Sequence, residues 1–441
     1  MSRTSSSSSA RSYDAPPRVS FDPLTLRRAY TEYLGKLGPH APGMKGTDLG
    51  IAFEAARDDR LVFLFGDTMA TDDRPDLQDV DFAATSSLVS PSDVTRALDW
   101  IGPLAPPGLA LPRFGTPVEG LTRDDETFVF FVTDFDERTQ KHATSALTKT
   151  RGLALDRLEV VHRAGAERFG NLSTIVEGDD VFVLGSGQPY RKSAIHLARV
   201  PLAKIEDRSA WRAERDPIID VQQVGELSAR KHPTLPLYLL AYNSAEPRGI
   251  VLRLARSPAG PWIDAGMLYV ADDGYERFIH AKESAVGHDD GLSQPGDEET
   301  WGGEYGPYLV PSWFTEKDGA FGIVFTLSSW NPYCVHVLRT WLVPEGTALE
   351  RPQRGMDIEP TRLASDGTFT VDAKTKGLRF TIGPRTIRPV TALLSSGTHV
   401  LRASRSQRFR SRLVEWNLEG YRGDLLRFEP GNADVRDLTF F

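Results

Sequence analysis

The sequence has a single cysteine, Cys334, among 441 residues. One thiol excludes an intrachain disulfide framework and any cysteine-based zinc cluster. Cys334 lies in the apolar segment PYCVHVL, so we expect a strand residue and not a nucleophile. The nine histidines are scattered without the spacing of zinc ligands, and we interpret them as core or surface residues.

Long hydrophobic runs are also missing. No run approaches the roughly 18 apolar residues of a membrane span, so no membrane partner is expected. The Ser-rich residues 1–20 contain Arg3 and Arg11, but no apolar stretch follows them. This segment therefore lacks the pattern of a standard secretory signal, and we predict a disordered tail. By sequence alone the compartment would be the cytoplasm.

A surplus of basic residues is absent too. The net charge is −8 and the isoelectric point is near 5.7. A nucleic-acid partner would require a basic face, so that class is disfavoured. The motifs HExxH, GxGxxG, GxSxG and the phosphate-binding loop do not occur. Metalloprotease, nucleotide-binding and serine-hydrolase functions therefore lack their signatures.

Turn-forming residues are plentiful, whereas helical patterns are few. The 38 glycines, 30 prolines and 8 tryptophans favour a strand-rich soluble protein. Apolar spacing over Asp22–Leu37 predicts a short lead-in helix with Asp22 as its N-cap. Ser92–Trp100 could form one or two helical turns, whereas Arg74–Ser90 and Tyr275–Thr300 resemble loops.

Gly46–Thr68 has the pattern of a β-hairpin. An alternating strand precedes the polar turn around Asp58–Asp59, and a nearly continuous apolar strand follows it. Folding about that turn brings Asp48 beside Asp67, since cross-strand neighbours lie about 5 Å apart and diagonal ones about 7–8 Å. Two carboxylates at one end of a hairpin suit acid–base chemistry. Aspartate at a strand end is also common turn chemistry, so a structural role remains the alternative.

Similar hairpins recur along the chain. Four segments have the same order of alternating strand, polar turn and apolar strand: Thr116–Asp134, Asn171–Gln188, Glu226–Asn243 and Gly306–Trp330. In most units a third extended run follows, for example Ile195–Val200. Five units of three or four strands predict an all-β fold, a five-bladed β-propeller over residues 21–350. A β-sandwich or β-helix is the competing architecture.

Residues 351–441 form a separate C-terminal β-rich appendage in this interpretation. Short extended runs alternate with Gly, Ser and Pro, which suits a small sandwich. The runs are Thr368–Val371, Leu378–Ile382, Thr391–Leu394, His399–Ala403 and Arg410–Trp416. Arginines such as Arg402 and Arg410 make the segment locally basic. We interpret them as a solvated strand face, with an ancillary sugar-binding or wall-binding module as the alternative.

The propeller hypothesis places polar and aromatic residues around one mouth of the central channel. Innermost strands converge there. The hairpin ends would bring together five pairs: Asp48 with Asp67, Thr116 with Asp134, Asn171 with Gln188, Glu226 with Asn243, and Gly306 with Trp330. Amides and carboxylates bind hydroxyl groups, and aromatic faces pack on the C–H patches of sugars. Besides the two aspartates, the predicted substrate-binding residues are Asp134, Asn171, Glu226, Asn243, Glu304, Tyr305, Tyr308, Trp330 and Asn331. No cofactor is expected. A structural calcium ion on the axis would leave no mark in the sequence.

Three stretches resemble the endo-D-arabinanase type of glycoside hydrolase. They are GTDLG with FGDT at 46–68, YGPYLVPSW at 305–313 and TLSSWNPYCVHVLR at 326–339. SPAGPW at 257–262 is a phrase of five-bladed propeller glycosidases in general. The resemblance implies a five-bladed propeller and inverting hydrolysis of α-D-arabinofuranosyl linkages, as in mycobacterial arabinan. Its essential aspartates correspond to Asp48 and Asp67. Family members usually carry an export signal, which this chain lacks, so family and sequence disagree on the compartment.

Inverting hydrolysis requires one protonated carboxyl and one carboxylate, about 6.5–9.5 Å apart. Nearby carboxylates push each other's pKa values apart, which leaves one protonated near neutral pH. Asp48 and Asp67 are the predicted pair, with the roles of acid and base unassigned. Glu304, Glu226 or Asp134 could supply the acid instead. A non-catalytic carbohydrate-binding propeller is the alternative function. A lyase is a third, which no Tyr/His pair supports.

Overall fold

The computed structural model describes residues 21–38, 40–55, 60–87, 91, 98–274, 278–279 and 302–349, followed by the strands β23 to β29 within residues 368–440. The predicted tail over residues 1–20 and the hairpin turn at Asp58–Asp59 lie outside these ranges. Most of the predicted helix Ser92–Trp100 and of the predicted loop Tyr275–Thr300 also lies outside them.

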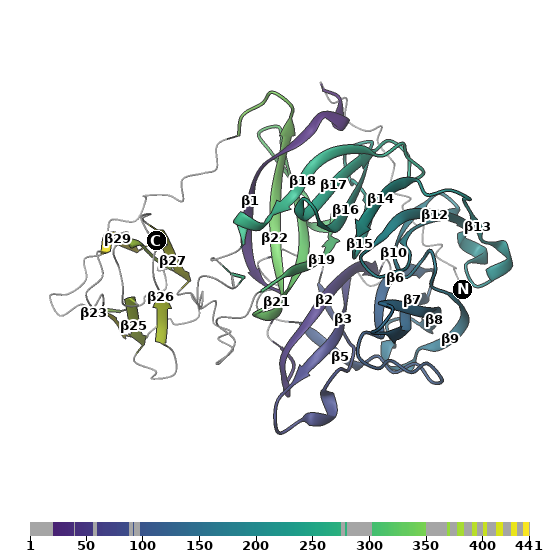
Figure 1. Cartoon of the computed structure of the whole chain (residues 1–441), viewed down its shortest axis with the longest axis horizontal. Helices are drawn as coiled ribbons and strands as arrows, with labels where there is room; N and C mark the ends of the chain where they lie inside the picture. Colours follow the sequence, from purple (N-terminus) through teal and green to yellow (C-terminus); the bar gives the residue numbers. More distant parts are fainter. Residues whose placement is uncertain are drawn as a thin grey trace, which may run out of the picture.

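Five antiparallel sheets form the blades of a five-bladed β-propeller, which confirms the predicted fold (Figure 1). The first blade contains β2 (Met44–Ala55), β3 (Arg60–Ala70), β4 (Phe82–Ser87) and β5 (Asp99–Pro103). The second contains β6 (Thr116–Arg123), β7 (Glu126–Asp136), β8 (Lys141–Arg151) and β9 (Glu159–Gly165). The third contains β10 (Asn171–Glu177), β11 (Asp180–Ser186) and β12 (Ser193–Pro201), with β13 (Arg212–Ala213) and β14 (Ile219–Val224) both paired to β12.

The two remaining blades complete the ring. The fourth contains β15 (Leu227–Lys231), β16 (Tyr238–Ala245), β17 (Arg248–Ala255) and β18 (Ile263–Val270). The fifth contains β19 (Glu304–Leu309), β20 (Thr315–Lys317), β21 (Ala320–Trp330), β22 (Tyr333–Pro344) and β1 (Leu26–Lys36). The innermost strands β2, β6, β10, β15 and β19 each contact the innermost strand on either side, so the ring is closed.

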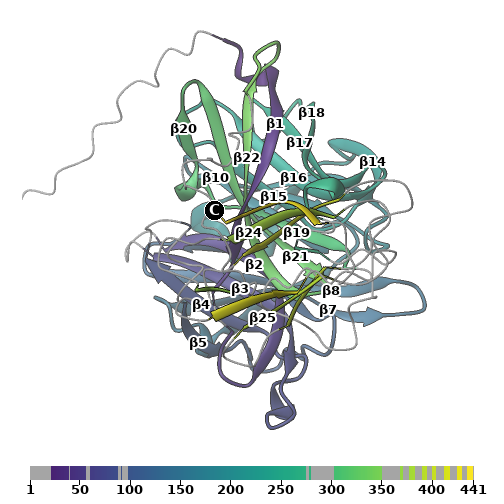
Figure 2. The same ribbon diagram turned by 90° about the vertical axis from the view of Figure 1, so that its left-hand side faces the viewer.

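The predicted lead-in helix over Asp22–Leu37 is wrong. Asp22 does cap a short 3₁₀ turn at Pro23–Thr25, where its side chain accepts the Leu24 N–H. The chain then extends as β1 and pairs with β22, from Leu26 opposite Pro344 to Lys36 opposite His336 (Figure 2). Because β22 lies some 300 residues later, local spacing could not reveal a partner that satisfies the β1 backbone. The N-terminal strand therefore closes the last blade.

Apolar packing between blades explains the nearly continuous hydrophobic second strands. Leu61 to Phe65 in β3 and Phe128 to Val132 in β7 are all buried, since a strand inside a propeller blade is covered on both faces. The expected loop Arg74–Ser90 contains β4, which is too short and too rich in Ala and Ser to show this pattern. That expectation is corrected accordingly.

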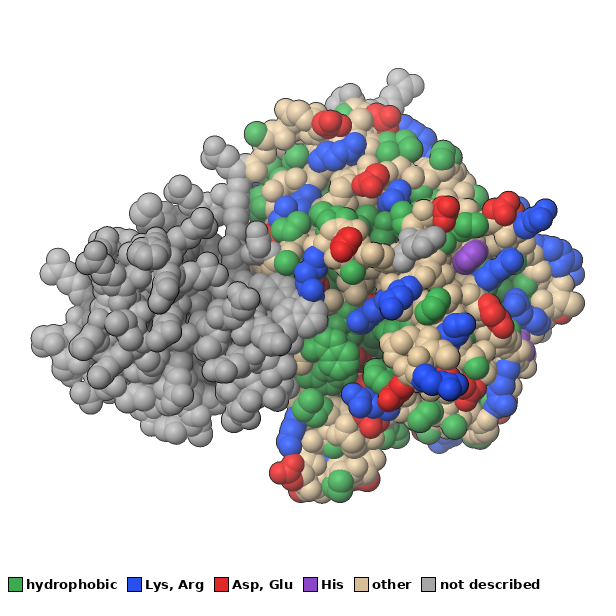
Figure 3. All heavy atoms as spheres, viewed as in Figure 1, with side chains coloured by type: hydrophobic (Ala, Val, Ile, Leu, Met, Phe, Trp, Pro, Cys, Tyr) green, Lys and Arg blue, Asp and Glu red, His purple; other side chains and the backbone are tan. Residues whose placement is uncertain are grey.

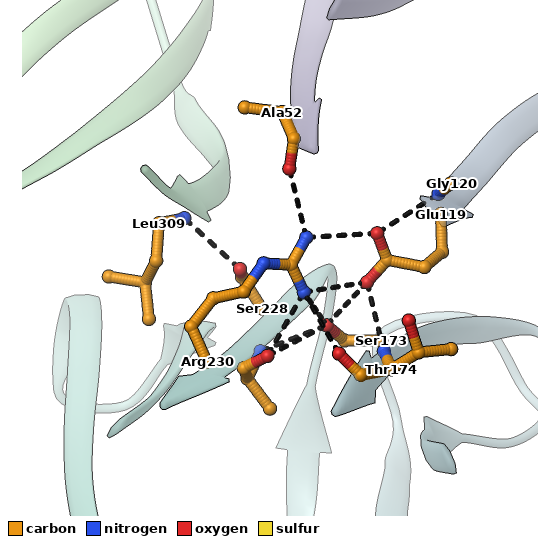
Figure 4. A network of polar contacts seen from close by, with 9 residues as sticks. Ala52, Glu119, Gly120, Ser173, Thr174, Ser228, Arg230 and Leu309 are labelled. Atoms are coloured by element: carbon orange, nitrogen blue, oxygen red, sulfur yellow. Dashed lines mark hydrogen bonds and ion pairs between the residues drawn. The ribbon is translucent and has the colours of Figure 1, made fainter. Parts of the chain in front are cut away.

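A buried ion pair joins the innermost strands at the centre of the ring (Figure 4). The Arg230 guanidinium donates to both carboxylate oxygens of Glu119, at 2.8 and 2.9 Å, and to the Ala52 carbonyl at 3.0 Å. It also reaches Ser173 Oγ at 2.7 Å. Ser228 in the same strand accepts the Leu309 N–H at 3.0 Å. All five innermost strands are therefore linked by polar contacts, and a guanidinium supplies the positive charge among them.

The C-terminal strands form two further sheets that share no strand with the blades. One has the order β23-β28-β25-β26 and the other β27-β24-β29. Their bounds are β23 (Thr368–Thr370), β24 (Gly377–Ile382), β25 (Val390–Leu394), β26 (Val400–Ala403), β27 (Arg412–Asn417), β28 (Leu425–Glu429) and β29 (Val435–Phe440). The expected runs up to residue 416 correspond to strands, and β28 and β29 are additional.

The described surface carries charges of both signs. On the face in Figure 3, acidic and basic side chains are interspersed over the propeller. No helix within the described ranges is long and apolar enough to cross a membrane.

Candidate active site

Asp48 and Asp67 lie side by side at one end of the first blade, as the hairpin predicted. Asp48 in β2 pairs with Gly66 in β3, and the register shifts between Gly46 and Asp48. Asp67 follows in a left-handed conformation with φ 36°. A non-glycine residue rarely adopts this conformation, which takes the Asp67 backbone out of the strand ladder. The irregular register thus brings both carboxyls to the same mouth.

The Asp48 carboxyl lies on the floor of this mouth. Its side chain is 5% exposed, and Oδ2 accepts a hydrogen bond of 2.7 Å from the Tyr305 hydroxyl. Oδ1 has no hydrogen-bond partner among the described residues. Burial and then the charge of Asp67 raise the pKa of Asp48 to about 8, although the tyrosine hydroxyls oppose the shift. Asp48 therefore keeps a proton at neutral pH.

Asp67 is more accessible and more acidic. Its carboxylate oxygens accept the Phe114 N–H at 3.2 and 3.3 Å, and its carbonyl accepts the Tyr333 hydroxyl at 2.7 Å. Burial raises the pKa of Asp67 to about 6, while the Phe114 N–H and the charge of Arg113 limit the rise. Near neutral pH this pair therefore holds one proton and one negative charge, with the proton on Asp48.

Glu226 is a third carboxylate at the mouth, but it is paired. It is 2% exposed and forms an ion pair of 2.7 Å with Arg191, and the Tyr190 hydroxyl donates to the same oxygen. Asn243 Nδ2 lies 3.4 Å from the other oxygen, so the predicted Glu226–Asn243 pair is present. Burial alone would raise the pKa of Glu226, but Arg191 and Tyr190 hold it below its ordinary value. Glu226 is therefore a fixed anion and a poor proton donor.

Arg191 connects this anion with the aspartates. Its guanidinium lies over the Tyr190 ring at 4.8 Å and over the Tyr305 ring at 5.2 Å, and Tyr305 in turn holds Asp48. Arg191 has a φ of 59°, again a left-handed conformation in a bulky residue. Sequence reasoning missed Arg191 and Tyr190, because PYR beyond a predicted strand end carries no recognisable signal.

The aromatic residues divide into a floor and a platform. Tyr305 and Tyr308 are 2% and 4% exposed, and burial raises the pKa of each phenol well above its ordinary value. Trp330 is 39% exposed, and its ring centroid lies 5.3 Å from Tyr305 and 5.8 Å from Tyr333. Trp330 is therefore the aromatic face that a ligand can reach.

The other predicted residues lie in different settings. Glu304 is buried and forms an ion pair of 3.3 Å with Arg248, and Asn331 is buried. Asn171 is half-buried and Asp134 is exposed.

Asp48 pairs with Gly66, one residue from the predicted Asp67, and three more of the five predicted hairpin-end pairs are displaced. The register sets Thr116 opposite Val132 and not Asp134, and Asn171 opposite Ser186 and not Gln188. The predicted pair of Gly306 with Trp330 is replaced by Tyr305 opposite Ser328. In the second and fifth blades, bulges and irregular register account for part of the offset. In the third blade the ladder is regular and ends two residues before Gln188.

Metal-binding geometry is not evident at this mouth. Within the described ranges, no group of three or more His, Cys, Asp or Glu side chains is arranged to hold an ion.

Part of the chain matches the model of one protein family. Residues 130–339 match DUF4185, a domain of unknown function. The match covers somewhat less than half of the chain and begins in β7, beyond Asp48 and Asp67. No curated protein matches the chain.

Solved structures share the fold at low sequence identity. An exo-β-1,3-galactanase from Phanerochaete chrysosporium with β-1,3-galactotriose superposes with a TM-score of 0.51 at 11% identity, covering 93% of this chain and 100% of its own. The same enzyme with galactose gives a TM-score of 0.50 with the same identity and coverage. An α-L-arabinofuranosidase from Podospora anserina gives 0.43 at 10% identity over 73% of this chain and 98% of its own. The galactanase comparison supports the fold assignment.

Proposed function

We propose that this protein is an inverting glycoside hydrolase that cleaves arabinofuranosyl linkages in a polysaccharide such as D-arabinan. The main supporting observation is the pair of neighbouring carboxyls, Asp48 and Asp67, with pKa values of about 8 and 6 at the propeller mouth. One proton donor and one carboxylate are what an inverting mechanism requires. The resemblance of the segments at 46–68, 305–313 and 326–339 supports the choice of substrate.

In this mechanism Asp48 protonates the leaving glycosidic oxygen, and Asp67 removes a proton from the attacking water. The assignment follows the pKa order, because the acid must be protonated and the base ionised at working pH. Water then adds to the anomeric carbon as the glycosidic C–O bond breaks. Because Asp48 is only 5% exposed, the leaving oxygen must reach the floor of the mouth.

Two neighbouring groups would bind the sugar. Trp330 offers an exposed ring for the C–H face of a sugar, and Arg191 offers N–H groups that Glu226 does not occupy. A fixed Glu226 anion beside Arg191 keeps the guanidinium oriented. The galactanase that shares the fold, described with a galactotriose, supports a carbohydrate as the ligand class.

The test is incubation of the full chain with mycobacterial arabinogalactan, followed by chromatography of the products. Oligosaccharide ladders released by the wild type, but not by Asp48→Asn or Asp67→Asn, would support the proposal. Proton NMR of the first product would show inversion at the anomeric carbon. Retention of the polysaccharide in an affinity gel without new reducing ends would indicate a carbohydrate-binding module instead. Full activity in either variant would reject the assigned pair.

A further inference from the structure

A third aspartate, Asp81, contacts the backbone of the proposed base. Asp81 lies immediately before β4 and is 2% exposed. Its Oδ1 accepts the Asp67 N–H at 3.2 Å. That N–H is free for a side chain because Asp67, at φ 36°, has left the ladder between β2 and β3. Asp81 therefore satisfies the donor that the unusual Asp67 conformation exposes.

The second oxygen of Asp81 lies in a crowded buried space. Within the described ranges neither Asp81 Oδ2 nor Asp48 Oδ1 accepts a hydrogen bond at normal distance, and the nearby Thr116 hydroxyl is likewise unpaired. A Cβ built on Gly66 would be 2.3 Å from Thr116 Oγ1 and 3.0 Å from Asp48 Oδ1, so both side chains lie close against the Gly66 backbone. A buried carboxylate oxygen without a donor is strongly disfavoured, so this geometry calls for a proton on Asp81.

We propose that Asp81 is a positioning residue that acts as a neutral carboxyl. It fixes Asp67 through the backbone N–H and adds no negative charge beside the proposed base. This inference rests on the proposed hydrolase function for its catalytic meaning, but the neutral buried carboxyl can be tested without any substrate. Asp81 itself neither touches the glycosidic bond nor transfers a proton.

The surrounding charges agree with a neutral Asp81. Burial and then the charge of Asp67 raise the pKa of Asp81 well above its ordinary value. The Asp67 N–H, which Asp81 Oδ1 accepts, and the nearby Thr116 hydroxyl oppose this rise in pKa without reversing it. Asp79 and Arg113 are further charged groups that act on Asp67. An ionised Asp81 would place a second negative charge next to Asp67, and like charges in a buried site repel each other.

Kinetics of two Asp81 variants separate a neutral positioning role from a catalytic charge. Asp81→Asn keeps an acceptor for the Asp67 N–H and mimics the protonated acid, so kcat should stay within about threefold of wild type. Asp81→Ala removes the acceptor, and kcat should fall by about 30- to 100-fold with KM changed less than about threefold. Asp73→Asn, at an exposed aspartate in the connection between β3 and β4, is the matched control.

Two kinetic results would overturn the inference. A loss of more than about 100-fold in Asp81→Asn would mean that the charge itself is needed. An Asp81→Ala enzyme as active as wild type would mean that positioning by Asp81 is unnecessary. Circular dichroism of each variant establishes that the sheets have formed. The pH–rate profile of Asp81→Asn should superimpose on that of wild type, because a residue already neutral leaves the Asp67 ionisation unchanged.

Thermal unfolding gives a readout that is independent of hydrolysis. A carboxyl whose pKa is raised by folding lowers stability as pH rises above its unfolded pKa, because the unfolded chain releases the proton that the folded chain retains. Asp81→Asn removes this effect. Its Tm should exceed that of wild type by at least about 2 °C at pH 7.5, and the two should converge near pH 4. An equal or lower Tm at pH 7.5 would refute a neutral Asp81, whereas a wild type without hydrolase activity would refute only the proposed function.

Discussion

Replacing Asp48 by Asn should strongly reduce the proposed hydrolysis and yet stabilise the protein. The folded-state pKa of Asp48 is about 8, against 3.8 for an ordinary aspartate. At pH 7 the unfolded carboxyl is ionised, whereas the folded one retains its proton. The difference of about 3 pKa units up to pH 7, at about 1.4 kcal/mol per unit, corresponds to roughly 4 kcal/mol of lost stability at most. Asn cannot ionise, and it keeps an oxygen for the Tyr305 hydroxyl.

The expected gain for Asp48→Asn is about 2–4 kcal/mol at pH 7, since relaxation and coupling to Asp67 reduce the upper limit. The sign follows from linkage. A carboxyl with a raised folded pKa costs nothing below pH 4, and its cost grows as pH rises towards 8. Thermal unfolding at pH 4 and pH 7 therefore measures the effect, as a Tm increase of roughly 2–6 °C at pH 7 that vanishes near pH 4. Hydrolysis should fall by about 10²- to 10⁴-fold, the usual contribution of a general acid.

Asp73→Asn is the matched control for this prediction, because Asp73 is exposed in a loop next to the same hairpin. It should change neither Tm nor activity. If Asp48→Asn were less stable than wild type at pH 7, or if its Tm difference were the same at both pH values, Asp48 would be ionised in the folded protein. The assignment of Asp48 as the acid would then be wrong.

Three further predictions concern the same mouth. The pH–rate profile should be bell-shaped. We expect kcat/KM to fall below about pH 6, where Asp67 is protonated, and above about pH 8, where Asp48 loses its proton. A flat profile between pH 5 and 9 would contradict both roles. Trp330→Ala should raise KM about tenfold and leave kcat within about threefold. Tm should barely change, because the ring is exposed. An unchanged KM would mean that no sugar packs on this ring. Arg191→Met should lower the free energy of unfolding in urea by about 3–5 kcal/mol, because it leaves Glu226 buried without its cation. A loss below about 1 kcal/mol would show that Glu226 takes up a proton instead.

Most of the fold could be predicted from the repeated hairpin pattern. Apolar second strands such as Leu61–Phe65, each after an alternating strand and a polar turn, follow from local rules of strand burial. The all-β class, the five blades and the pairing of Glu226 with Asn243 could therefore be predicted. The position of Asp48 beside Asp67 also follows, because both residues belong to one hairpin only 19 positions apart in the sequence.

Elements that depend on distant partners could not be predicted in this way. β1 has a spacing compatible with a helix, and only its pairing with β22 makes it a strand. β4 lacks an apolar pattern, since Ala83 and Ala84 pack in a confined space between blades. The Arg230–Glu119 ion pair joins residues 111 positions apart, so no local sequence pattern predicts it.

The chain itself thus determined the hairpins, the blade count and the two neighbouring aspartates, since turn chemistry and alternation act over a few residues. Tertiary structure alone decided the chemical state of the site. Burial raises the pKa of Asp48, and closure of the ring brings Arg191 against Glu226. The irregular backbone at Asp67 exposes an N–H that Asp81 accepts. Desolvation and long-range charge depend on everything packed around a group, and this environment exists only once the ring of blades has closed.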